Sequence, residues 1–375
     1  MVMNQSHLCH VFPAFATGGP EIRTSALIDS TADTYRHTVI ALNGNLTGRG
    51  RVRRAEDVTF VDASQNGGQL GNAVKLRRLF KQLHPNLVLT YGWGGTDAAA
   101  VARLSGFRRV IHTEDGFLPD ESHQQKFKRV LVRRLVLRMP ARIVVPSRTL
   151  WRIATKIWWL PLRRVCFVPN GIDTQRFAPP SPETIQAARR RLGCLPEELV
   201  IGTVGHLREE KNQVRLLNAF AALSAHRPAR LLVLGDGPLR VALVRTVQEL
   251  GLVDRVVFTG VVNDTSAHYP AMDALAMSSD TEQMPLAILE AMGMGLPVVS
   301  TDVGDVKNMV SAENQRWVTP LGNDQAYVQA LTDLADSPAE RVRIGRANRE
   351  KCACDYSFGE MVKSYLDLYR EVLAE

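Results

Sequence analysis

Two acidic residues stand out because of the segment in which they fall. Glu282 and Glu290 are separated by seven residues in the stretch SSDTEQMPLAILEAMGMGLPVVSTDVG. Pro285 suits the first position of a helix, where the N–H group that proline lacks would be unpaired in any case. Glu282 is therefore expected in a loop before that helix, and Glu290 in its second turn. The N–H groups of a helix start favour an anion, so the two acids would flank an anion site.

Glu290 needs an explanation of its own because its neighbours in the helix are apolar. Burying a carboxylate is costly unless it is hydrogen-bonded or paired. Vicinal hydroxyls of a sugar would supply the hydrogen bonds, and two acids beside a phosphate site predict a ligand with sugars at both ends. The alternative is that Glu290 pairs with a basic residue inside its own domain while Glu282 is solvated.

Two further loops carry groups suited to a diphosphate. In FATGGPEIRTSAL, Gly18 and Gly19 would let backbone N–H groups approach an anion at a helix start, although a plain tight turn explains them equally well. In GTVGHLREEKNQ, Arg208 and Lys211 could hold a leaving phosphate as its charge develops. Taken alone, this second loop is explained more simply as a solvated helix start.

The elements that position these loops follow from the pattern of apolar segments. Short apolar stretches such as HTVIAL, NLVLTYG and RLLVLGDG alternate with helix-like ones such as GNAVKLRRLFKQLH, which is typical of parallel strands covered on both faces. At 375 residues, two doubly wound α/β domains in tandem are expected, with the boundary in VPNGIDTQRFAPPSPET. Ligands of such sheets bind beyond the carboxyl ends of the strands. The cleft between the domains is therefore the predicted active site.

The composition argues against several classes of protein. No apolar run approaches the roughly 20 residues of a spanning helix, and the N-terminus lacks the features of a signal peptide, so a cytoplasmic protein is expected. Five cysteines without a Cys-x-x-Cys repeat indicate reduced thiols rather than a disulfide framework or a zinc site. The absence of a G-x-G-x-x-G fingerprint argues against a Rossmann dehydrogenase.

Positive charge is concentrated in one segment. The net charge is +8, and residues 122–164 hold twelve Lys and Arg with no Asp or Glu. Such a segment seeks an anionic partner. Because the cations are interleaved with Val, Leu and Trp, an anionic membrane face is the preferred partner, with solvated arginines around a core strand as the alternative. The residues expected to face the membrane include Arg133, Arg134, Arg138, Trp151, Trp158 and Trp159. No recognised module accompanies the charge, so nucleic acid is not expected.

Taken together, these segments resemble retaining glycosyltransferase family 4. EQMPLAILEAMGMGLPVVSTDVG is similar to its E-x7-E signature, GTVGHLREEKNQ to its G-R-L-x-x-x-K loop, and ATGGPE to its N-terminal Gly-Gly loop. VPNGIDTQRF, LGDGP and YSFGEMVKSYLDLYREVL are similar to its interdomain segment, its next strand end and its final helix. The resemblance covers nearly the whole chain in the right order. It implies the GT-B fold, which is α/β with two Rossmann-like doubly wound domains facing across a cleft.

The resemblance also implies the domain roles and the site. Residues 1–172 would bind the acceptor and residues 173–357 the nucleotide sugar, with the helix at 358–375 packed back on the first domain. Glu290 would accept hydrogen bonds from the ribose, Glu282 would contact the transferred sugar, and Lys211 would neutralise the diphosphate. The catalytic residues would be Glu282 and His112, and the substrate-binding residues Gly18, Gly19, His206, Arg208, Lys211, Gln283, Met284, Pro285, Leu286 and Glu290.

Three positions depart from the family pattern. His206 stands where an arginine is usual, and Arg208, two residues on, is a candidate replacement. Gln283 stands where a glycine usually follows the first glutamate, and Asp115 stands where close relatives often carry a second histidine. These departures bear on the stabilisation of the leaving group and on contacts with the acceptor more than on the fold.

The implied activity is that of a retaining hexosyltransferase. It would move a hexosyl group from a UDP- or GDP-sugar to a glycan or lipid-linked saccharide, in the synthesis of cell-surface polysaccharide or glycoconjugates. No Asp-x-Asp motif occurs, so neither a metal nor another cofactor is expected. The implied location is cytoplasmic and peripheral, on the inner face of the plasma membrane. The alternatives are a sugar-nucleotide epimerase or hydrolase of the same fold, or a non-catalytic scaffold at the membrane.

Overall fold

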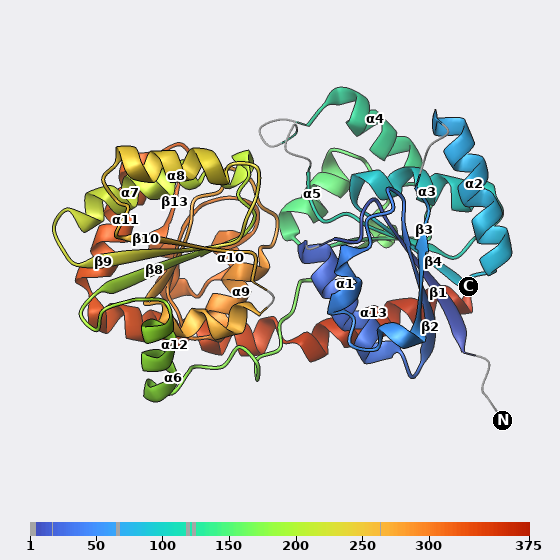
Figure 1. The fold of residues 1–375 in the computed structure, drawn as a ribbon. Helices are drawn as coiled ribbons and strands as arrows, with labels where there is room; N and C mark the ends of the chain where they lie inside the picture. The colour runs from blue at the N-terminus through green and yellow to red at the C-terminus, as the bar shows by residue number, and fades with distance from the viewer. Residues whose placement is uncertain (1–4, 17, 65–67, 118–120, 122–124, 263) are drawn as a thin grey trace. The chain divides into compact units, whose positions relative to one another are not determined.

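The chain forms two compact units, each built around one parallel β-sheet. The computed structural model describes residues 5–16, 18–64, 68–117, 121, 125–262 and 264–375. The first unit consists of Met1–Asn170 together with Glu360–Glu375, and the second of Gly171–Gly359. The chain therefore crosses from the first unit to the second after Asn170 and returns near the start of its last helix. Figure 1 labels most of the helices and strands, numbered in chain order.

The sheet of the first unit has seven strands in the order β3-β2-β1-β4-β5-β6-β7, and every pairing is parallel. The strands are β1 (Ser6–Phe12), β2 (Tyr35–Ala41), β3 (Val58–Asp62), β4 (Leu87–Tyr91), β5 (Val110–Thr113), β6 (Arg142–Val145) and β7 (Val165–Phe167). Strands β1 and β4 are buried at nearly every position. This is expected of central parallel strands, which are covered on both faces.

Five helices lie between these strands in the chain, and a sixth, at the end of the chain, belongs mostly to the same unit. They are α1 (Gly19–Thr31), α2 (Gly68–Leu83), α3 (Gly92–Leu104), α4 (Phe127–Val136), α5 (Arg148–Lys156) and α13 (Phe358–Ala374). Helix α5 begins where the Ser147 hydroxyl accepts a hydrogen bond from the N–H of Leu150 at 2.9 Å, which is the usual capping arrangement for serine. The ring of Tyr369 in α13 lies edge-on to that of Tyr35 in β2, with 6.2 Å between centroids.

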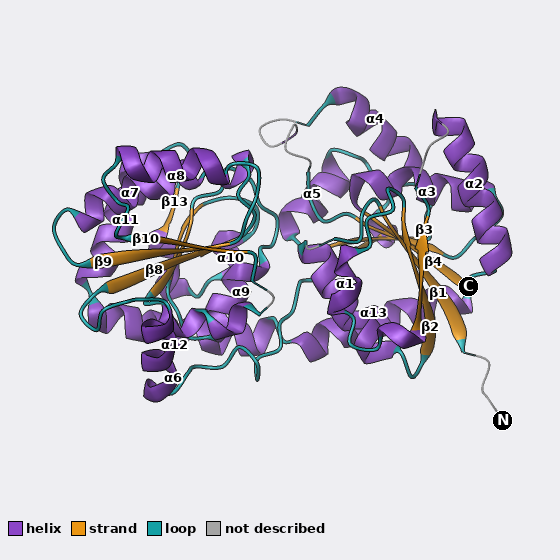
Figure 2. Ribbon diagram, in the orientation of Figure 1, coloured by secondary structure: helices purple, strands orange, loops and turns teal. Residues whose placement is uncertain are grey.

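The second unit repeats the plan with six parallel strands in the order β10-β9-β8-β11-β12-β13. The strands are β8 (Leu199–Val204), β9 (Ala229–Leu234), β10 (Val256–Gly260), β11 (Ala274–Met277), β12 (Val298–Thr301) and β13 (Val318–Thr319). The helices are α6 (Pro182–Arg191), α7 (Gln213–Ser224), α8 (Arg240–Glu249), α9 (Leu286–Gly293), α10 (Val306–Met309), α11 (Asp324–Asp336) and α12 (Pro338–Asp355). In Figure 2, helices flank the strands of each unit.

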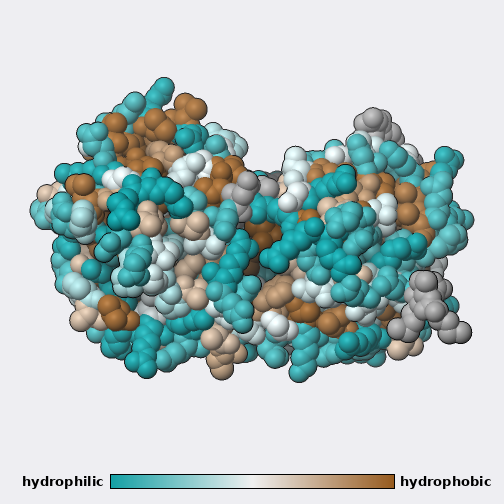
Figure 3. Space-filling model, turned by 60° about the horizontal axis from the view of Figure 1, so that its bottom comes forward, coloured by the Kyte–Doolittle hydropathy of each residue, from teal (hydrophilic) through white to brown (hydrophobic). Residues whose placement is uncertain are grey.

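The predicted fold class, two doubly wound α/β domains, is confirmed by these two parallel sheets. The surface drawn in Figure 3 mixes hydrophilic and hydrophobic residues, and the hydrophobic ones form several separate patches on the visible face. Over the described part of the chain, every helix is too short or too polar to cross a membrane.

Candidate functional site

Lys211 and Glu282 form an ion pair in the second unit. The Lys211 Nζ lies 2.5 Å from Oε1 of Glu282, and the Ser279 hydroxyl donates a hydrogen bond to the same oxygen at 2.9 Å. The Glu282 side chain is only 10% exposed, and that of Lys211 is 26% exposed. The alternative in which Glu282 is solvated is therefore wrong. The resemblance assigned Lys211 to the diphosphate and Glu282 to the transferred sugar of one ligand, and in the structure these two side chains are in direct contact.

Lys211 is positioned by a tight turn after β8. Gly205 directly follows that strand with a φ of +155°, and a Cβ atom at Gly235 would lie 1.9 Å from the Gly205 carbonyl oxygen. Only glycine fits where these two strand-end turns approach each other. The chain then runs through Lys211 to Asn212, whose left-handed backbone and side-chain oxygen cap α7 by accepting a hydrogen bond from the N–H of Arg215 at 3.3 Å.

The loop that carries Glu282 is held by charges and by a close backbone approach. Arg215 of α7 lies 2.7 Å from Asp280 and donates a hydrogen bond to the Ser278 carbonyl at 2.7 Å. On the other side, a Cβ atom at Gly304, where φ is +57°, would lie 2.4 Å from the Glu282 carbonyl oxygen. The glutamate is therefore fixed between the start of α7 and the turn after β12.

Glu290 lies in the second turn of α9, as predicted, and is satisfied by hydroxyl groups. Its Oε2 accepts hydrogen bonds from Tyr269 at 2.8 Å and Thr265 at 3.0 Å. Burial raises the pKa of Glu290 to about 6, although the two hydroxyls and the charge of Arg176 act in the opposite direction. Arg176 itself pairs with Asp264 at 2.8 Å. Among the described residues Glu290 forms no ion pair, so the alternative of an internal salt bridge is wrong.

The residues between the two glutamates form the entry to α9. Pro285 is the N-cap rather than the first helical residue, because its ψ of 124° lies outside the helical range, and the helix begins at Leu286. Gln283 and Met284 are buried, whereas Pro285 and Leu286 are partly buried. The Gln283 carbonyl accepts a hydrogen bond from the N–H of Asp305 at 3.0 Å. The first N–H groups of α9 have no carbonyl behind them in the helix, which leaves them able to bind an anion.

His206 and Arg208 lie in the loop between β8 and Lys211. The N–H of Arg208 donates to the His206 carbonyl, and the N–H of Lys211 donates to the Arg208 carbonyl, both at 3.1 Å. The His206 carbonyl also accepts a hydrogen bond from the Gln213 side chain at 3.0 Å. His206 is partly buried and Arg208 is exposed, so the two side chains have different surroundings within one short turn.

Gly18 and Gly19 belong to the first unit and begin α1. Gly18 is the N-cap of that helix, and its carbonyl accepts a hydrogen bond from the N–H of Ile22 at 3.0 Å. A Cβ atom at Gly18 would lie 2.4 Å from a carboxylate oxygen of Glu21. The two glycines therefore stand at a helix start, as the sequence suggested. Their phosphate-binding role stays a prediction.

Asp115 has a defined partner in the same unit. Both of its carboxylate oxygens accept hydrogen bonds from Arg23 of α1, at 2.6 and 2.9 Å. Arg23 also donates to the Asn170 side chain at 2.9 Å and is itself buried. Asp115 raises the pKa of Arg23 against the opposing effect of burial, so the guanidinium is charged at any ordinary pH. Where the family pattern has a second histidine, this chain therefore has a bidentate ion pair.

His112, the predicted catalytic histidine, lies in β5 and is completely buried. Its Nδ1 is 2.8 Å from the Thr90 hydroxyl. Its Nε2 has no hydrogen-bond partner in the structure and lies 3.9 Å from Oε2 of Glu114. Glu114 is equally buried, and neither of its carboxylate oxygens is hydrogen-bonded. The sequence analysis missed Glu114, although it follows His112 by two residues at a strand end.

Arg133 lies beside this pair and is also completely buried. Its Nε is 3.6 Å from Glu114, and its two terminal nitrogens donate to the two oxygens of Glu121 at 3.1 and 3.0 Å. Its guanidinium lies among three aromatic rings, with the Trp93 centroid at 4.8 Å and that of Trp158 at 5.1 Å. The expectation that Arg133 and Trp158 face a membrane is therefore wrong. Both fill the core of the first unit.

The residues around Glu290 and Glu282 that sequence reasoning missed are mostly hydroxyls. Thr265, Tyr269 and Ser279 are common residue types with no fixed spacing from the acids they contact, so the sequence offers no signal for them. Within the described ranges, no group of three or more His, Cys, Asp or Glu side chains is placed to hold a metal ion.

Comparison with known proteins finds two family models that match this chain. The family described as "Glycosyl transferases group 1" matches residues 184–351, and that described as "Glycosyltransferase Family 4" matches residues 17–176. The two matches fall on the second and the first unit. The match to residues 184–351 covers all six strands of the second sheet, whereas the match to residues 17–176 begins after β1 and covers β2 to β7.

Individual relatives and solved structures agree with those matches. The chain is 32% identical over 218 residues to a 2-deoxystreptamine glucosyltransferase from Streptomyces kanamyceticus, covering 57% of this chain and 56% of that one. The chain thus spans about half the length of that relative. It is 24% identical over 307 residues to the UDP-Gal:alpha-D-GlcNAc-diphosphoundecaprenol alpha-1,3-galactosyltransferase of Escherichia coli, covering 80% and 79%. The structure of Anabaena HepE in complex with UDP and glucose has a TM-score of 0.85 at 17% identity, covering 98% and 100%.

Proposed function

The chain belongs to the family 4-like glycosyltransferases of the GT-B fold, and we propose that it moves a hexosyl group from a UDP- or GDP-sugar to a glycan or lipid-linked saccharide with retention of configuration. The observation that carries this proposal is the arrangement around α9. One glutamate paired with a lysine precedes the helix, and a second glutamate held by hydroxyls lies within it.

Glu282 and Glu290 both bind the donor. Glu290 accepts hydrogen bonds from the ribose hydroxyls, which replace or join those of Thr265 and Tyr269 at its carboxylate. Glu282 accepts hydrogen bonds from hydroxyls of the transferred sugar. The N–H groups at the start of α9 meet the distal phosphate, because a helix start favours an anion. The nucleotide sugar thus lies along α9, with the diphosphate between the two acids.

Lys211 stabilises the leaving group. As the bond from the anomeric carbon to the phosphate oxygen breaks, negative charge grows on the phosphate, and a cation held in place beforehand stabilises that charge most. The Lys211 ammonium is held by Glu282 in the structure, and part of its hydrogen bonding passes to the phosphate when the donor binds. Lys211, Arg208 and the helix start perform the neutralisation that a metal performs elsewhere, so transfer proceeds without a divalent ion.

The acceptor is bound by the first unit. The acceptor hydroxyl attacks the anomeric carbon from the face that the phosphate leaves, and its proton passes to the departing phosphate. In this proposal His112 has a catalytic role on the acceptor side, and Gly18 and Gly19 contribute to binding of the diphosphate. A lipid-linked acceptor is supported by the name of the Escherichia coli relative, which acts on a saccharide attached to diphosphoundecaprenol.

A donor panel tests the transfer. The purified protein is incubated with UDP-glucose, UDP-galactose, UDP-N-acetylglucosamine and GDP-mannose and a membrane lipid extract, each with and without EDTA. We expect one donor to be consumed with formation of a glycolipid, at the same rate in EDTA. Donor consumption without glycosylated product would indicate a hydrolase or epimerase, binding without turnover a scaffold, and loss of activity in EDTA a metal-dependent mechanism.

A membrane contact is supported by the outer face of α4. Phe127, Leu131 and Leu135 recur at four-residue intervals, so they share one face of the helix, and they are 76%, 46% and 64% exposed. The opposite face packs inward through Val130 and Arg133. An exposed apolar stripe of this kind suits a lipid interface when basic residues accompany it.

Basic residues flank this stripe and order the loop beside it. Arg134 donates a hydrogen bond to the Ile157 carbonyl at 2.9 Å and lies 3.8 Å from the centroid of the Trp159 ring. Arg138 donates to the Trp159 carbonyl at 2.9 Å. Trp159 is itself largely exposed. The apolar stripe and the basic rim together fit an anionic membrane surface, where the enzyme would meet a lipid-linked acceptor.

Vesicle sedimentation tests the membrane contact. Phe127→Ser combined with Leu135→Ser should reduce sedimentation with vesicles of phosphatidylcholine and phosphatidylglycerol, and high salt should reduce it in the wild type. Leu104→Ser, at an exposed leucine of the same unit that lies on α3, is the matched control and should sediment normally. Equal sedimentation of all three proteins would show that α4 does not contact the membrane.

A further inference from the structure

The first unit contains a cavity of about 830 Å³ at the amino ends of its strands. Its lining comes from the segments that enter β4, β5, β6 and β7 and from the end of α13. These four strands are consecutive neighbours in the sheet, so the segments before them meet at one edge. His112 lies near the carboxyl end of β5, and Gly18 follows β1 in the chain, and parallel strands place these carboxyl ends at the opposite edge of the sheet. The cavity is therefore separate from the proposed transfer site.

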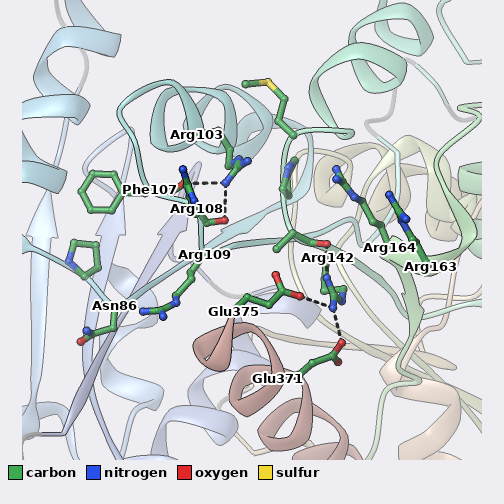
Figure 4. A pocket seen from close by; sticks show the side chains of 14 residues that line it. Asn86, Arg103, Phe107, Arg108, Arg109, Arg142, Arg163, Arg164, Glu371 and Glu375 are labelled. Carbon is green, nitrogen blue, oxygen red and sulfur yellow. Dashed lines mark hydrogen bonds and ion pairs between the residues drawn. The ribbon is translucent and has the colours of Figure 1, made fainter.

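The cavity is strongly basic. Six of its lining residues are arginines, and two are glutamates. The arginines are Arg103, Arg108, Arg109, Arg142, Arg163 and Arg164. In the view of Figure 4, Arg103, Arg108 and Arg109 lie to one side of Arg142, and Arg163 and Arg164 to the other. Arginine is the residue best suited to phosphate, because its planar guanidinium offers two parallel donors.

The two glutamates both engage the same arginine. Arg142, the first residue of β6, forms ion pairs with Glu371 and with Glu375, the latter at 2.6 Å. Arg103 donates to the Arg108 carbonyl at 2.7 Å, which leaves the charge of its guanidinium uncompensated by an acid. Across the described residues, Arg108 and Arg163 form no ion pair with a carboxylate. Most of the positive charge around the cavity is therefore unneutralised.

We propose that this cavity binds a small ligand carrying two or more phosphate groups, at a site distinct from the one that binds the donor. A cavity of this size lies within the roughly 300–1,000 Å³ of small-molecule sites. Arginines distributed on both sides of Arg142 exceed what one phosphate could neutralise. The ligand neutralises them with its phosphates and competes with Glu371 and Glu375 for Arg142. The end of α13 is thereby released from β6 when the ligand binds.

Two sources could supply such phosphates, a free polyphosphate compound or a phospholipid head group with two phosphates. Tripolyphosphate represents the first and cardiolipin in phosphatidylcholine vesicles the second. Binding of tripolyphosphate is measured by titration calorimetry with UDP and GDP present in excess, so that the donor site is occupied. Vesicle binding is measured by sedimentation, with phosphatidylcholine vesicles as the blank.

The decisive variant is Arg108→Glu combined with Arg163→Glu, which reverses two charges on opposite sides of the cavity. We expect the affinity for the ligand to fall at least about tenfold, because hydrogen bonds to charged groups are the strong ones. Arg77→Glu combined with Arg78→Glu on α2 is the matched control. It makes the same change of net charge at exposed arginines of the same unit that do not line the cavity, and it should bind as the wild type does.

A second variant tests the competition for Arg142. Glu371→Gln combined with Glu375→Gln removes the competing charges and should tighten binding several-fold, with the far-ultraviolet circular dichroism spectrum and melting temperature showing that the unit is folded. Loss of tripolyphosphate binding in the charge-reversed variant identifies a soluble ligand, and loss of cardiolipin binding alone identifies a lipid. The proposal is overturned if the charge-reversed variant and its control bind both probes as the wild type does. Neither result depends on the transfer activity.

Discussion

Each unit buries a carboxylate beside its candidate site, but the two carboxylates are satisfied in different ways. Glu290 in the second unit accepts hydrogen bonds from Tyr269 and Thr265. Glu114 in the first unit has no hydrogen bond to either oxygen, and its nearest cation is Arg133, whose Nε is 3.6 Å away. Glu290 is thus stabilised by hydrogen bonds from neutral hydroxyls, and Glu114 by the positive charge of the buried Arg133.

This difference in how the two carboxylates are stabilised indicates different roles for the two units in ligand binding. Hydroxyls can exchange for those of a sugar without leaving a buried charge behind, so the surroundings of Glu290 are suited to binding and release. The cluster of Glu114, Arg133 and Glu121 is held by charge, and removing Arg133 leaves Glu114 without a nearby cation, while Glu121 keeps its ion pair with Arg129 at 3.0 Å. We therefore interpret the second unit as the one that binds the donor. The cluster of Glu114, Arg133 and Glu121 in the first unit is interpreted as a rigid support for His112.

Arg133→Met should produce the largest effect on stability. Arg133 donates to both oxygens of Glu121 and faces Glu114, so its loss leaves the buried carboxylate of Glu114 without a nearby cation and that of Glu121 with Arg129 in place of two arginines. We expect the free energy of unfolding to fall by about 3–5 kcal/mol, measured by urea denaturation. Removing the second charge as well, in Arg133→Met with Glu114→Gln, should recover part of that loss.

The control for this change is the next residue along α4. Arg134→Met removes the same functional group from a partly exposed side chain whose hydrogen bond goes to a backbone carbonyl, and it should shift the free energy of unfolding by less than about 1 kcal/mol. If both methionine variants unfold at the same urea concentration, the cluster of Glu114, Arg133 and Glu121 does not contribute to the stability of the fold. The proposed difference between the two buried carboxylates would then be wrong.

The sequence predicted the second unit better than the first for a physical reason. Glu282, Lys211 and the start of α9 lie in local motifs, where one strand end or one helix start places the residues. The support of His112 depends on Glu121 and Arg133, which follow β5 in the loop after it and in α4 and meet it only through packing. Charge along the chain suggested an exposed role for Arg133. The three aromatic rings that enclose it are set by tertiary structure.

Glu282→Ala should produce the largest effect on activity. It removes the group that accepts hydrogen bonds from the hydroxyls of the transferred sugar and frees Lys211 from its ion pair. In the transition state the sugar is then less well oriented, and the Lys211 ammonium is no longer held in place. We expect kcat to fall on the order of 10²–10³-fold, with little change in nucleotide affinity. Glu209→Ala, at an exposed acid in the turn before Lys211, is the control and should retain activity. If Glu282→Ala and Glu209→Ala have the same kinetics, the assignment of Glu282 to the active site is wrong.

Glu290→Gln should act on binding and on its pH dependence. Its pKa is raised to about 6 by burial, so the carboxylate that accepts the ribose hydrogen bonds forms as the pH rises through about 6. The Km for the donor should fall across that range in the wild type and stay flat in the variant, with a loss of about tenfold at pH 8. A wild-type profile that is flat between pH 5 and 8 would contradict this assignment.

The same shift of the Glu290 pKa has a consequence for stability. The pKa in the folded protein, about 6, lies above the ordinary value of 4.5, so the folded state binds more protons between these two values. The contribution of Glu290 to stability is therefore full below about pH 4.5 and is lost as the pH rises through 6. Subtracting the unfolding profile of Glu290→Gln from that of the wild type should isolate this slope.

Tyr269→Phe should produce the smallest effect and tests whether hydroxyls hold Glu290. The Tyr269 hydroxyl donates to Oε2 of Glu290 at 2.8 Å and lowers the pKa of that carboxyl, whereas Thr265 would still donate after the change. The midpoint of the Km profile should therefore move to higher pH, with a change of only a few-fold at pH 8. Tyr327→Phe is the control, because that buried hydroxyl in the same unit has no hydrogen-bond partner. If both phenylalanine variants leave the midpoint in place, the hydroxyls do not hold the carboxylate, and the contrast between Glu290 and Glu114 loses its basis.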